Sequence, residues 1–240
     1  MHDDGVLVAD LGAVTAALGL TQPVLDGAQA VSPPAAGPGW PGKRALDVVL
    51  ALGILLVAIP VFLVVAVVIK LTSDGPVFFR QQRVGRGGRE FPMLKFRTMH
   101  TGSEERLRSD PALQEIFLEC GHKVPGHLDP RVTRAGRILR RLSLDELPQL
   151  LNVLSGHMSM VGPRPVERSQ LVRDYSGYEA AYLALRPGLT GLWQVSGRST
   201  VQFPERAEMD RHYLRTCGPW EDAKIILRTP RALLTGLGAD

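Results

Sequence analysis

The stretch RILRRLSLDELPQLLNVLSGHMSMVGPRP, residues 137–165, sets two adjacent carboxylates, Asp145 and Glu146, between a basic run and a hydrophobic run. Ser143 is predicted to be a helix N-cap, and Glu146, three residues later, would complete a capping box. The positions that repeat at helical spacing and predict one apolar face are Leu147, Leu150, Leu151 and Leu154. Both acids are therefore expected in a first helical turn, where free N–H groups and the helix dipole favour phosphate, carboxylate and bridging metal ions.

The acidic pair has a plain explanation as well, because acidic residues are favoured in first helical turns generally. Its neighbours favour a binding site for an anionic substrate, since cations stand on both sides of the pair. These cations are Arg131, Arg134, Arg137, Arg140, Arg141 and Arg164. Such positive surroundings are expected to keep Asp145 ionised.

Consecutive side chains diverge by about 100° on a helix, so the two acids cannot flank a glycosidic bond from opposite sides. A glycosidase pair is therefore not expected. One carboxylate can instead attack phosphorus while the other holds a metal ion or a proton. Mg²⁺ is the metal that such carboxylates bind together with substrate phosphates.

Composition narrows the class of protein. The 240 residues suit one domain with a real core. The net charge of +4 and the sequence pI of about 9.3 suit nucleic acid, anionic lipid or a phosphorylated substrate. The two cysteines, Cys120 and Cys217, are far apart and without metal-ligand spacing, which fits a reducing compartment.

The first part of the chain, residues 1–42, is predicted to be a disordered arm. It is poor in charge and rich in Ala, Gly and Pro, above all at residues 32–42. Asp3 and Asp4 stand where a secretory signal would carry basic residues, so a cleaved signal is not expected.

An apolar run, Ala45–Ile69, contains one charged residue, Asp47, and is long enough to cross a bilayer as a helix. A buried core helix is the soluble alternative. Pro60 lies near the middle of the run, where it removes a helical hydrogen bond. Both ends carry positive charge, which prefers the cytoplasmic side of a membrane, through Lys43, Arg44 and Lys70. These features predict a re-entrant helix with both ends in the cytosol.

The remaining chain alternates between a short β-hairpin and helices. Residues 77–84 and 91–99 read as two strands around a flexible basic turn, with Lys95 and Arg97 on one face. Helices are predicted at 101–118, along the basic run from 130, and at 166–182, 205–214 and 221–234; residues 190–198 are predicted to be rich in loops. In the basic run, the apolar side consists of Ile138, Leu139 and Leu142. This pattern is typical of a helix at a membrane surface and, equally, of an ordinary helix packed on a core.

Five long motifs follow one another from Lys43 to near the C-terminus. They are KRALDVVLA (43–51), GPVFFRQQRVGRGGREFPMLKFRTM (75–99), DPRVTRAGRILRRLSLDELPQLLNVLSGHMSMVGPRP (129–165), RPGLTGLWQVSGRS (186–199) and EDAKIILRTPRALLTG (221–236). Together they strongly resemble the bacterial sugar transferases, the monotopic polyprenyl-phosphate phosphoglycosyl transferases. The expected fold is α+β and mostly helical, in a monotopic membrane protein with one re-entrant helix (43–72), surface amphipathic helices and a small β-hairpin. Residues 73–240 would form the cytosolic catalytic domain.

The resemblance implies a reaction at the inner membrane of a bacterium, on its cytosolic face. A UDP-sugar would give its sugar-1-phosphate to Asp145 and release UMP, and undecaprenyl phosphate would then take the phosphosugar. Such a step opens the synthesis of an exopolysaccharide or surface glycan. Glu146 matches the second member of the catalytic pair, and Mg²⁺ would lie at both acids.

The resemblance also implies contacts to the substrate. It implies that Lys95 contacts a phosphate and that Arg140 and Arg164 lie near the site. It also implies that Pro163 and Pro165 belong to a turn that helps to hold the nucleotide. The loop around Arg198 offers a further phosphate or base contact. The chain departs from the family at Ile59-Pro60, where relatives have Ser-Pro, and at His157, where most have Asp.

Two other classes of protein compete with the enzyme. A membrane-anchored, non-catalytic scaffold would explain the apolar run and the basic surface but would leave Asp145 and Glu146 without a role. A nucleic-acid-binding protein would use the basic charge, but the membrane segment and the 6% aromatic content argue against it. Membrane lipids are the further partner expected, and the sequence leaves the oligomeric state open.

Overall fold

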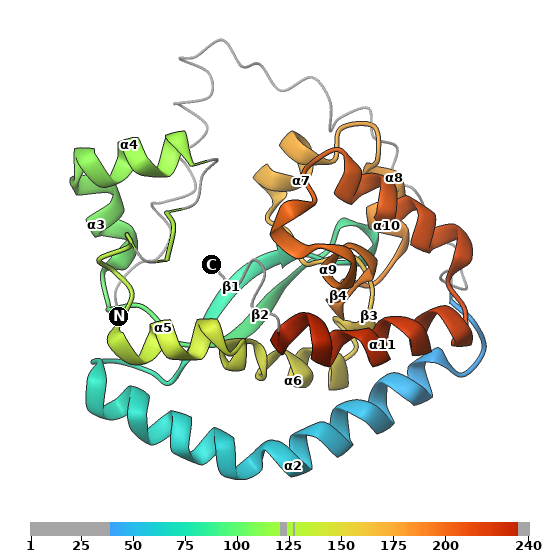
Figure 1. Cartoon of the computed structure of the whole chain (residues 1–240), viewed down its shortest axis with the longest axis horizontal. Coiled ribbons are helices and arrows are strands. Elements are labelled where there is room, and N and C mark those ends of the chain that lie inside the picture. Colours follow the sequence, from blue (N-terminus) through green and yellow to red (C-terminus); the bar gives the residue numbers. More distant parts are fainter. Residues whose placement is uncertain (1–38, 121–123, 127, 235–240) are drawn as a thin grey trace. The chain divides into compact units, whose positions relative to one another are not determined.

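The computed structural model describes residues 39–120, 124–126 and 128–234 (Figure 1). The predicted disordered arm lies outside the described residues except for its last four. The described chain is mostly helical, as predicted, and contains two small two-stranded sheets. The helices are α2 (Lys43–Thr72), α3 (Ser103–Ser109), α4 (Pro111–Glu119), α5 (Arg134–Arg141), α6 (Gln149–Leu154), α7 (Arg168–Asp174), α8 (Glu179–Ala184), α9 (Leu192–Ser196), α10 (Glu205–Thr216) and α11 (Pro219–Leu234). The strands are β1 (Phe78–Val84), β2 (Glu90–Phe96), β3 (Ser159–Val161) and β4 (Gly188–Thr190), and 3-10 turns cover Arg86–Gly88, Leu144–Glu146 and Arg198–Thr200.

The long apolar helix α2 is a surface element. By length and composition it could cross a membrane, and only 17% of its most apolar 18 residues are buried, so it is no core helix. One stripe of the helix faces the rest of the chain and consists of Asp47, Ala51, Ala58, Val65 and Ile69. The helix continues through Pro60 and is bent in Figure 1. The re-entrant path stays a prediction.

Both halves of α2 pack against the same folded body. In the first half, the Arg44 guanidinium donates to the carbonyl oxygens of Val153 and Leu154, at 2.6 and 2.8 Å, and so satisfies the end of α6. In the second half, Val65 and Ile69 pack with Phe96 and Leu139 in a small apolar cluster. The helix therefore lies along the body for its whole length.

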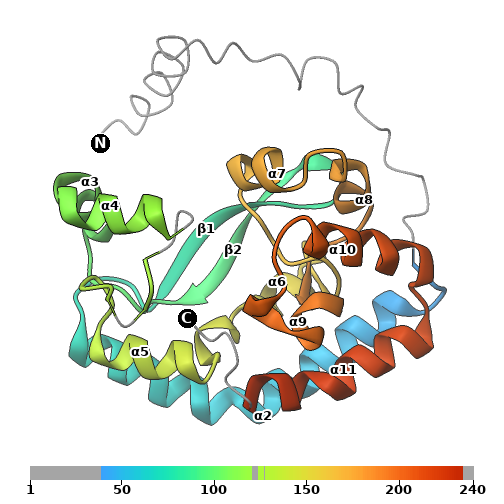
Figure 2. The ribbon, with the colours of Figure 1, turned by 45° about the horizontal axis from the view of Figure 1, so that its top comes forward.

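The predicted β-hairpin is confirmed. Strands β1 and β2 pair antiparallel, with Phe79 opposite Lys95 and Arg83 opposite Phe91. Cross-strand partners lie on the same face of a sheet, so Phe79, Arg83 and Lys95 share one face. On the other face, the Phe96 ring meets the ring of Phe62 on α2 and the ring of Phe78 on β1. The hairpin passes between the α3–α4 pair and helices α7, α8 and α10 (Figure 2).

A second, parallel pair of strands was not predicted. Strand β3 pairs with β4, Ser159 with Gly188 and Val161 with Thr190. A Cβ atom at Gly188 would lie 2.1 Å from the Gly162 nitrogen, so the two segments approach as closely as glycine allows. The prediction that residues 190–198 are rich in loops is wrong, because β4 ends and α9 lies within them.

The structure corrects two helix predictions and confirms two others. The segment 166–182 is not one helix but α7 and α8, separated near Gly177, which has a φ of 79°. In α5, Leu139 is buried, whereas Ile138 and Leu142 are 60% and 57% exposed, so the three do not form one apolar side. The helices predicted at 205–214 and 221–234 are confirmed as α10 and α11.

The main core lies where α2, β2, α6, β3 and the last two helices meet. Its fully buried members include Leu150 and Val153 of α6, Met158, Tyr213 of α10 and Ile225 of α11. Because α6 is packed on several sides, the turn that precedes it, with the acidic pair, is held in a fixed position.

Candidate active site

The two acids lie on a 3-10 turn, not in the first turn of an α-helix. Ser143 is not an N-cap: it adopts a left-handed conformation, with φ of 54°, and its side chain makes no capping bond. Pro148 gives the reason, because its ring would clash with the Leu144 carbonyl if both were inside one α-helix. The α-helix therefore starts only at Gln149.

The predicted apolar face of this helix is partly right. Leu147, Leu150 and Leu154 pack in the main core, whereas Leu151 is 39% exposed. Asn152 is buried instead, where it accepts from the Leu94 N–H at 2.9 Å and donates to the Pro92 carbonyl at 2.9 Å. These bonds tie α6 to strand β2.

Glu146 is the counterion of two cations from distant parts of the chain. Its Oε1 atom accepts from Arg164 Nη2 at 2.9 Å and from Lys95 Nζ at 3.4 Å. Burial by itself would raise the pKa of Glu146, but Arg164 and Lys95 outweigh it and lower the pKa to about 2. Glu146 is therefore a permanent anion in the folded protein at neutral pH.

Asp145 is buried but unpaired. Only 8% of the residue is exposed, and no described residue donates a hydrogen bond to its carboxylate. Burial raises the pKa of Asp145 and the charge of Glu146 adds to this effect, against the lowering influence of Lys95, Arg140 and Arg164. Desolvation of the carboxylate is the larger effect on its pKa, and the expectation that Asp145 stays ionised remains a prediction.

The three cations come from three separate elements. Lys95 lies near the end of β2, and burial lowers its pKa. Arg140 lies on α5, where its Nε donates to the Thr98 hydroxyl at 2.9 Å; burial lowers its pKa and Asp145 opposes that shift. Arg164 follows β3, and its pKa is raised chiefly by Glu146. The three cations outnumber the two carboxylates, so these five groups together carry a net positive charge.

The turn that carries Arg164 is clamped by its neighbours. The Pro163 carbonyl accepts from the Gly188 N–H at 2.7 Å, and a Cβ atom at Gly162 would lie 2.3 Å from the Arg186 carbonyl oxygen. Past Pro165, the Val166 carbonyl accepts from the Val84 N–H at 2.9 Å. The prolines thus fix the position of Arg164, and their contact with a nucleotide stays a prediction.

Other basic residues singled out in the sequence lie elsewhere. Arg131 forms a buried pair with Asp129 at 2.8 Å, and Arg141 is exposed. Arg97 does not accompany Lys95 at the acids, because its Nη1 donates to the Asp74 carbonyl at 2.9 Å.

Arg198 lies near the acidic pair without bonding it. Its Nη1 donates to the Ala232 carbonyl at 3.0 Å, and burial lowers its pKa while Glu146 opposes that shift. His157 shares a 2.8 Å hydrogen bond with the Ser155 hydroxyl through Nδ1 and stacks on Phe91. The ring is thus held by contacts to Ser155 and Phe91.

A magnesium ion fits the pair only together with substrate. Within the described ranges, no group of three or more His, Cys, Asp and Glu residues could hold a metal ion by themselves. The oxygen atoms that could bind the metal ion are those of the Asp145 carboxylate and the second carboxylate oxygen of Glu146, since its Oε1 atom is bonded to Lys95 and Arg164. Mg²⁺ commonly takes one or two carboxylates and completes its shell with phosphate oxygens and water, which suits this arrangement.

Sequence reasoning missed Arg83 on β1. Arg83 is half-buried and close enough to the pair to interact with it: burial lowers its pKa, Arg164 adds to the shift and Glu146 opposes it. The available signal was alternation, because Phe79, Gln81 and Arg83 must share the strand face of Lys95.

This arrangement, an unpaired buried carboxylate beside a second carboxylate and three cations, defines a class of site suited to transfer of a phosphoryl group. Residues 39–236 match the family model described as bacterial sugar transferase. The chain belongs to the bacterial sugar transferase family, as the sequence motifs predicted.

Named relatives agree with this assignment. The chain is 41% identical over 205 residues to the exopolysaccharide production protein ExoY of Sinorhizobium fredii, covering 84% of this chain and 89% of that protein. It is 46% identical over 203 residues to the UDP-glucose:undecaprenyl-phosphate glucose-1-phosphate transferase of Caulobacter vibrioides, covering 80% and 70%. It is 43% identical over 202 residues to the undecaprenyl-phosphate galactose phosphotransferase of Salmonella typhimurium, covering 82% of this chain and 41% of that longer protein.

Proposed function

We propose that this enzyme transfers a sugar-1-phosphate from a UDP-sugar to undecaprenyl phosphate in two steps. An Asp145 carboxylate oxygen attacks the β-phosphorus, the bond from that phosphorus to the bridging oxygen breaks, and UMP leaves. A phosphate oxygen of undecaprenyl phosphate then attacks the same phosphorus. This second step releases the Asp145 carboxylate and forms undecaprenyl-diphosphate sugar.

The observation that carries the proposal is the difference between the two acids. Glu146 is held by Lys95 and Arg164, whereas Asp145 has no donor among the described residues. A carboxylate without hydrogen bonds keeps its lone pairs for attack, and burial strips it of the water that would weaken it as a nucleophile. A non-catalytic scaffold would gain nothing from an unpaired buried carboxylate, which costs stability.

The cations have a role in each step. Lys95, Arg140 and Arg164 lie around the attacking oxygen and reduce its repulsion from an anionic phosphate. They also stabilise the charge that develops on the phosphoryl oxygens in the transition state. When Mg²⁺ is bound, held by Asp145 and Glu146, it would neutralise charge on the diphosphate and on the departing nucleotide.

The packing of α2 supports a monotopic position. A helix that crossed the bilayer could not hold both of its halves against one body on one side of the membrane, yet both halves of α2 pack on the catalytic body. The outward face of α2 is apolar and exposed, for example at Val57 and Leu63. Helices α5 and α11 flank α2 in Figures 1 and 2 and expose Ile138, Leu142, Trp220 and Leu227. We place this surface in one leaflet of the bacterial inner membrane, with the catalytic part in the cytosol.

The relatives suggest the biological setting. The relative from Sinorhizobium fredii is named for exopolysaccharide production, and the one from Caulobacter vibrioides for UDP-glucose and undecaprenyl phosphate. On that ground we assign this chain to the first membrane step of exopolysaccharide or surface glycan synthesis, with UDP-linked hexoses as substrates to test first.

The decisive experiment is intact-protein mass spectrometry. Purified enzyme is incubated with a UDP-hexose and without undecaprenyl phosphate, and the expected result is a mass increase equal to one phosphosugar on Asp145. Adding undecaprenyl phosphate should remove this mass. Asp145→Asn should abolish both adduct and turnover, whereas Asp174→Asn, at an acid on α7 paired with Arg173, should change neither.

Two results would contradict the proposal. One is full turnover by Asp145→Asn with no adduct in wild type, which would mean that the lipid phosphate attacks the UDP-sugar directly. The other concerns the metal: UMP release that survives complete chelation by EDTA would exclude a requirement for Mg²⁺.

A further inference from the structure

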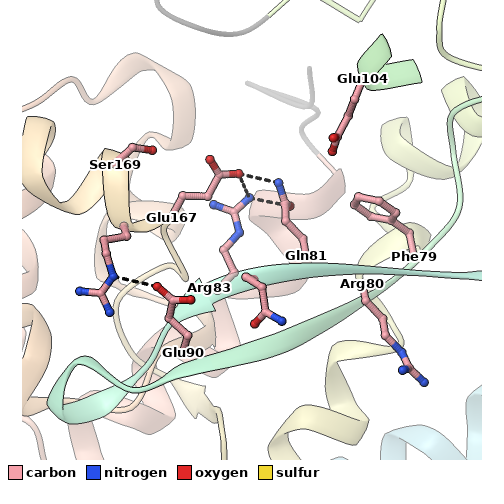
Figure 3. Close-up of a pocket in the computed structure, with 10 residues that line it drawn as sticks. Phe79, Arg80, Gln81, Arg83, Glu90, Glu104, Glu167 and Ser169 are labelled. Carbon is pink, nitrogen blue, oxygen red and sulfur yellow. Dashed lines mark hydrogen bonds and ion pairs between the residues drawn. The ribbon is translucent and has the colours of Figure 1, made fainter. Parts of the chain in front are cut away.

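A polar pocket lies along strand β1, outside the acidic pair. It has a volume of about 400 Å³. Figure 3 shows Phe79, Gln81 and Arg83 on one side of β1, with Glu167 beside Gln81 and Arg83 and with Glu104 of α3 above Phe79. Glu167 immediately precedes α7. The pocket is therefore built from the hairpin and two separate helical segments.

The pocket adjoins the reacting groups. Phe79 at its edge is the cross-strand partner of Lys95, which bonds Glu146. Directly opposed side chains lie within about 5.5 Å of each other at Cβ and share a face. Arg83, deeper in the pocket, is close enough to Glu146 and Arg164 for both to shift its pKa. A ligand with its phosphate at the acidic pair can thus extend a neighbouring group along β1.

The lining holds an organised set of hydrogen-bonding groups. Gln81 Nε2 donates to Glu167 Oε1 at 2.6 Å, and Arg83 Nη2 donates to Gln81 Oε1 at 2.7 Å. The guanidinium also pairs with Glu167 at 3.7 Å. The Nε atom of Arg83 is buried and has no hydrogen-bond partner in the described part of the chain. Buried donors are nearly always satisfied, so the guanidinium is an incompletely bonded group at the wall of the pocket.

We propose that this pocket binds the sugar ring of the nucleotide sugar and that Gln81 and Glu167 determine which sugar is accepted. The inference rests on the proposed function, because it assumes that a UDP-sugar places its β-phosphate at Asp145. Carboxylate and amide oxygens accept from sugar hydroxyls, and the second N–H of the Gln81 amide can donate to a hydroxyl oxygen. Phe79, which is 39% exposed, offers an apolar face to the C–H side of the ring.

The other parts of the substrate fit this pocket less well. The lining carries three arginines and three carboxylates, so it offers no net positive charge to hold a diphosphate. Uracil carries a single N–H donor, so it would leave most of these acceptors without a partner. A hexose carries several hydroxyl groups, each of which donates and accepts, and so matches the lining best.

The direction of the specificity effect follows from this chemistry. A site that hydrogen-bonds a particular hydroxyl strongly rejects an analogue that lacks or misplaces it, since the buried polar groups are then left unpaired. Removing such a group should therefore change the preference between two epimeric sugars, not merely the affinity for all of them.

The test measures binding and turnover separately. Dissociation constants for UMP, UDP-glucose, UDP-galactose and UDP-N-acetylgalactosamine are measured by calorimetry on protein carrying Asp145→Asn, which prevents reaction. Gln81→Ala and Glu167→Gln are each added to that background, and kcat/KM is measured with the same changes in otherwise wild-type enzyme. We expect each change to alter the ratio between two UDP-sugars by about tenfold or more, and to alter UMP binding less than twofold. Asp174→Asn is the matched control and should leave every value unchanged.

Three outcomes would overturn the inference. UMP affinity that falls as much as UDP-sugar affinity would assign the pocket to the nucleotide. An equal loss for every UDP-sugar, or no loss at all, would show that the pocket does not read the sugar. If Glu167→Gln fails to fold, Glu104→Gln takes its place, because Glu104 makes no hydrogen bond among the described residues. Failure of the proposed function would be seen separately, as turnover by Asp145→Asn.

Discussion

The carboxylate of Asp47 accepts a hydrogen bond from the Ser159 hydroxyl at 3.0 Å and a second from the Met160 N–H at 2.9 Å. Asp47 is the one charged residue in the apolar run 45–69, and only 2% of it is exposed. Its partners belong to β3, which leads directly into the turn of Arg164. The membrane-length helix and the active-site turn are thus joined by a buried polar contact.

This contact predicts a loss of stability for Asp47→Ala. The change leaves two buried donors without an acceptor, which costs about 1–3 kcal/mol for each unsatisfied group. We expect Tm to fall by several degrees in thermal unfolding of detergent-solubilised protein. Thr72→Ala is the control, since the Thr72 hydroxyl bonds carbonyl oxygens within its own helix. An unchanged Tm in Asp47→Ala would show that the contact contributes nothing.

A second prediction concerns Glu146→Gln. The amide keeps the shape but removes the charge that holds Lys95 and Arg164, and it weakens the hold on a metal ion. We expect kcat to fall by about a hundredfold or more, within the range that general acid–base or electrostatic groups contribute. Steady-state release of UMP measures the effect. Glu221→Gln, which loses only an exposed pair with Lys224, should retain full activity; equal kcat in both variants would contradict a catalytic role.

Membrane topology can be tested at the two ends of α2. Pro41→Cys and Thr72→Cys place thiols at exposed positions just before and at the end of the helix, in protein with Cys120 and Cys217 changed to Ala. A re-entrant helix predicts that neither thiol reacts with a membrane-impermeant maleimide in intact cells, and that both react after permeabilisation. Reaction of one site from outside would mean that α2 spans the membrane.

The buried Asp210 predicts a dependence of stability on pH. Burial raises its pKa to about 7, although the Tyr175 hydroxyl bonds it at 2.7 Å and Arg206 lies near. Between pH 4 and 7 the folded state therefore holds a proton that the unfolded state has lost, so stability contributed by protonated Asp210 declines as pH rises through this range.

Asp210→Asn removes this titration while keeping an acceptor for Tyr175. We expect the Tm of the variant, relative to wild type, to rise by several degrees between pH 5 and pH 8 in matched thermal scans. A constant difference across the same buffers would mean that Asp210 does not change its protonation in the folded protein. The Asp174→Asn variant should show no such trend, because Asp174 lies at the surface beside Arg173.

Local patterns in the sequence were sufficient for several elements. Alternation around a glycine-rich turn predicted the β1–β2 hairpin, and the length of the apolar run predicted α2. The two helices at the end of the chain followed from their apolar spacing. The position of Asp145 and Glu146 between basic residues was also visible, because it depends on neighbours along the chain.

Tertiary structure alone decided which groups meet at the acids. Lys95 and Arg164 reach Glu146 from 51 residues before and 18 residues after it. Arg131 and Arg141 are nearer to Glu146 in the sequence, yet Arg131 pairs with Asp129 and Arg141 is exposed. The β3–β4 pair uses three residues on each strand, too few for any periodic signal. The left-handed Ser143 follows from the path between α5 and α6. Desolvation set the direction of the Asp145 pKa, because it depends on what packs around a carboxylate and not on which charges are near it in the sequence.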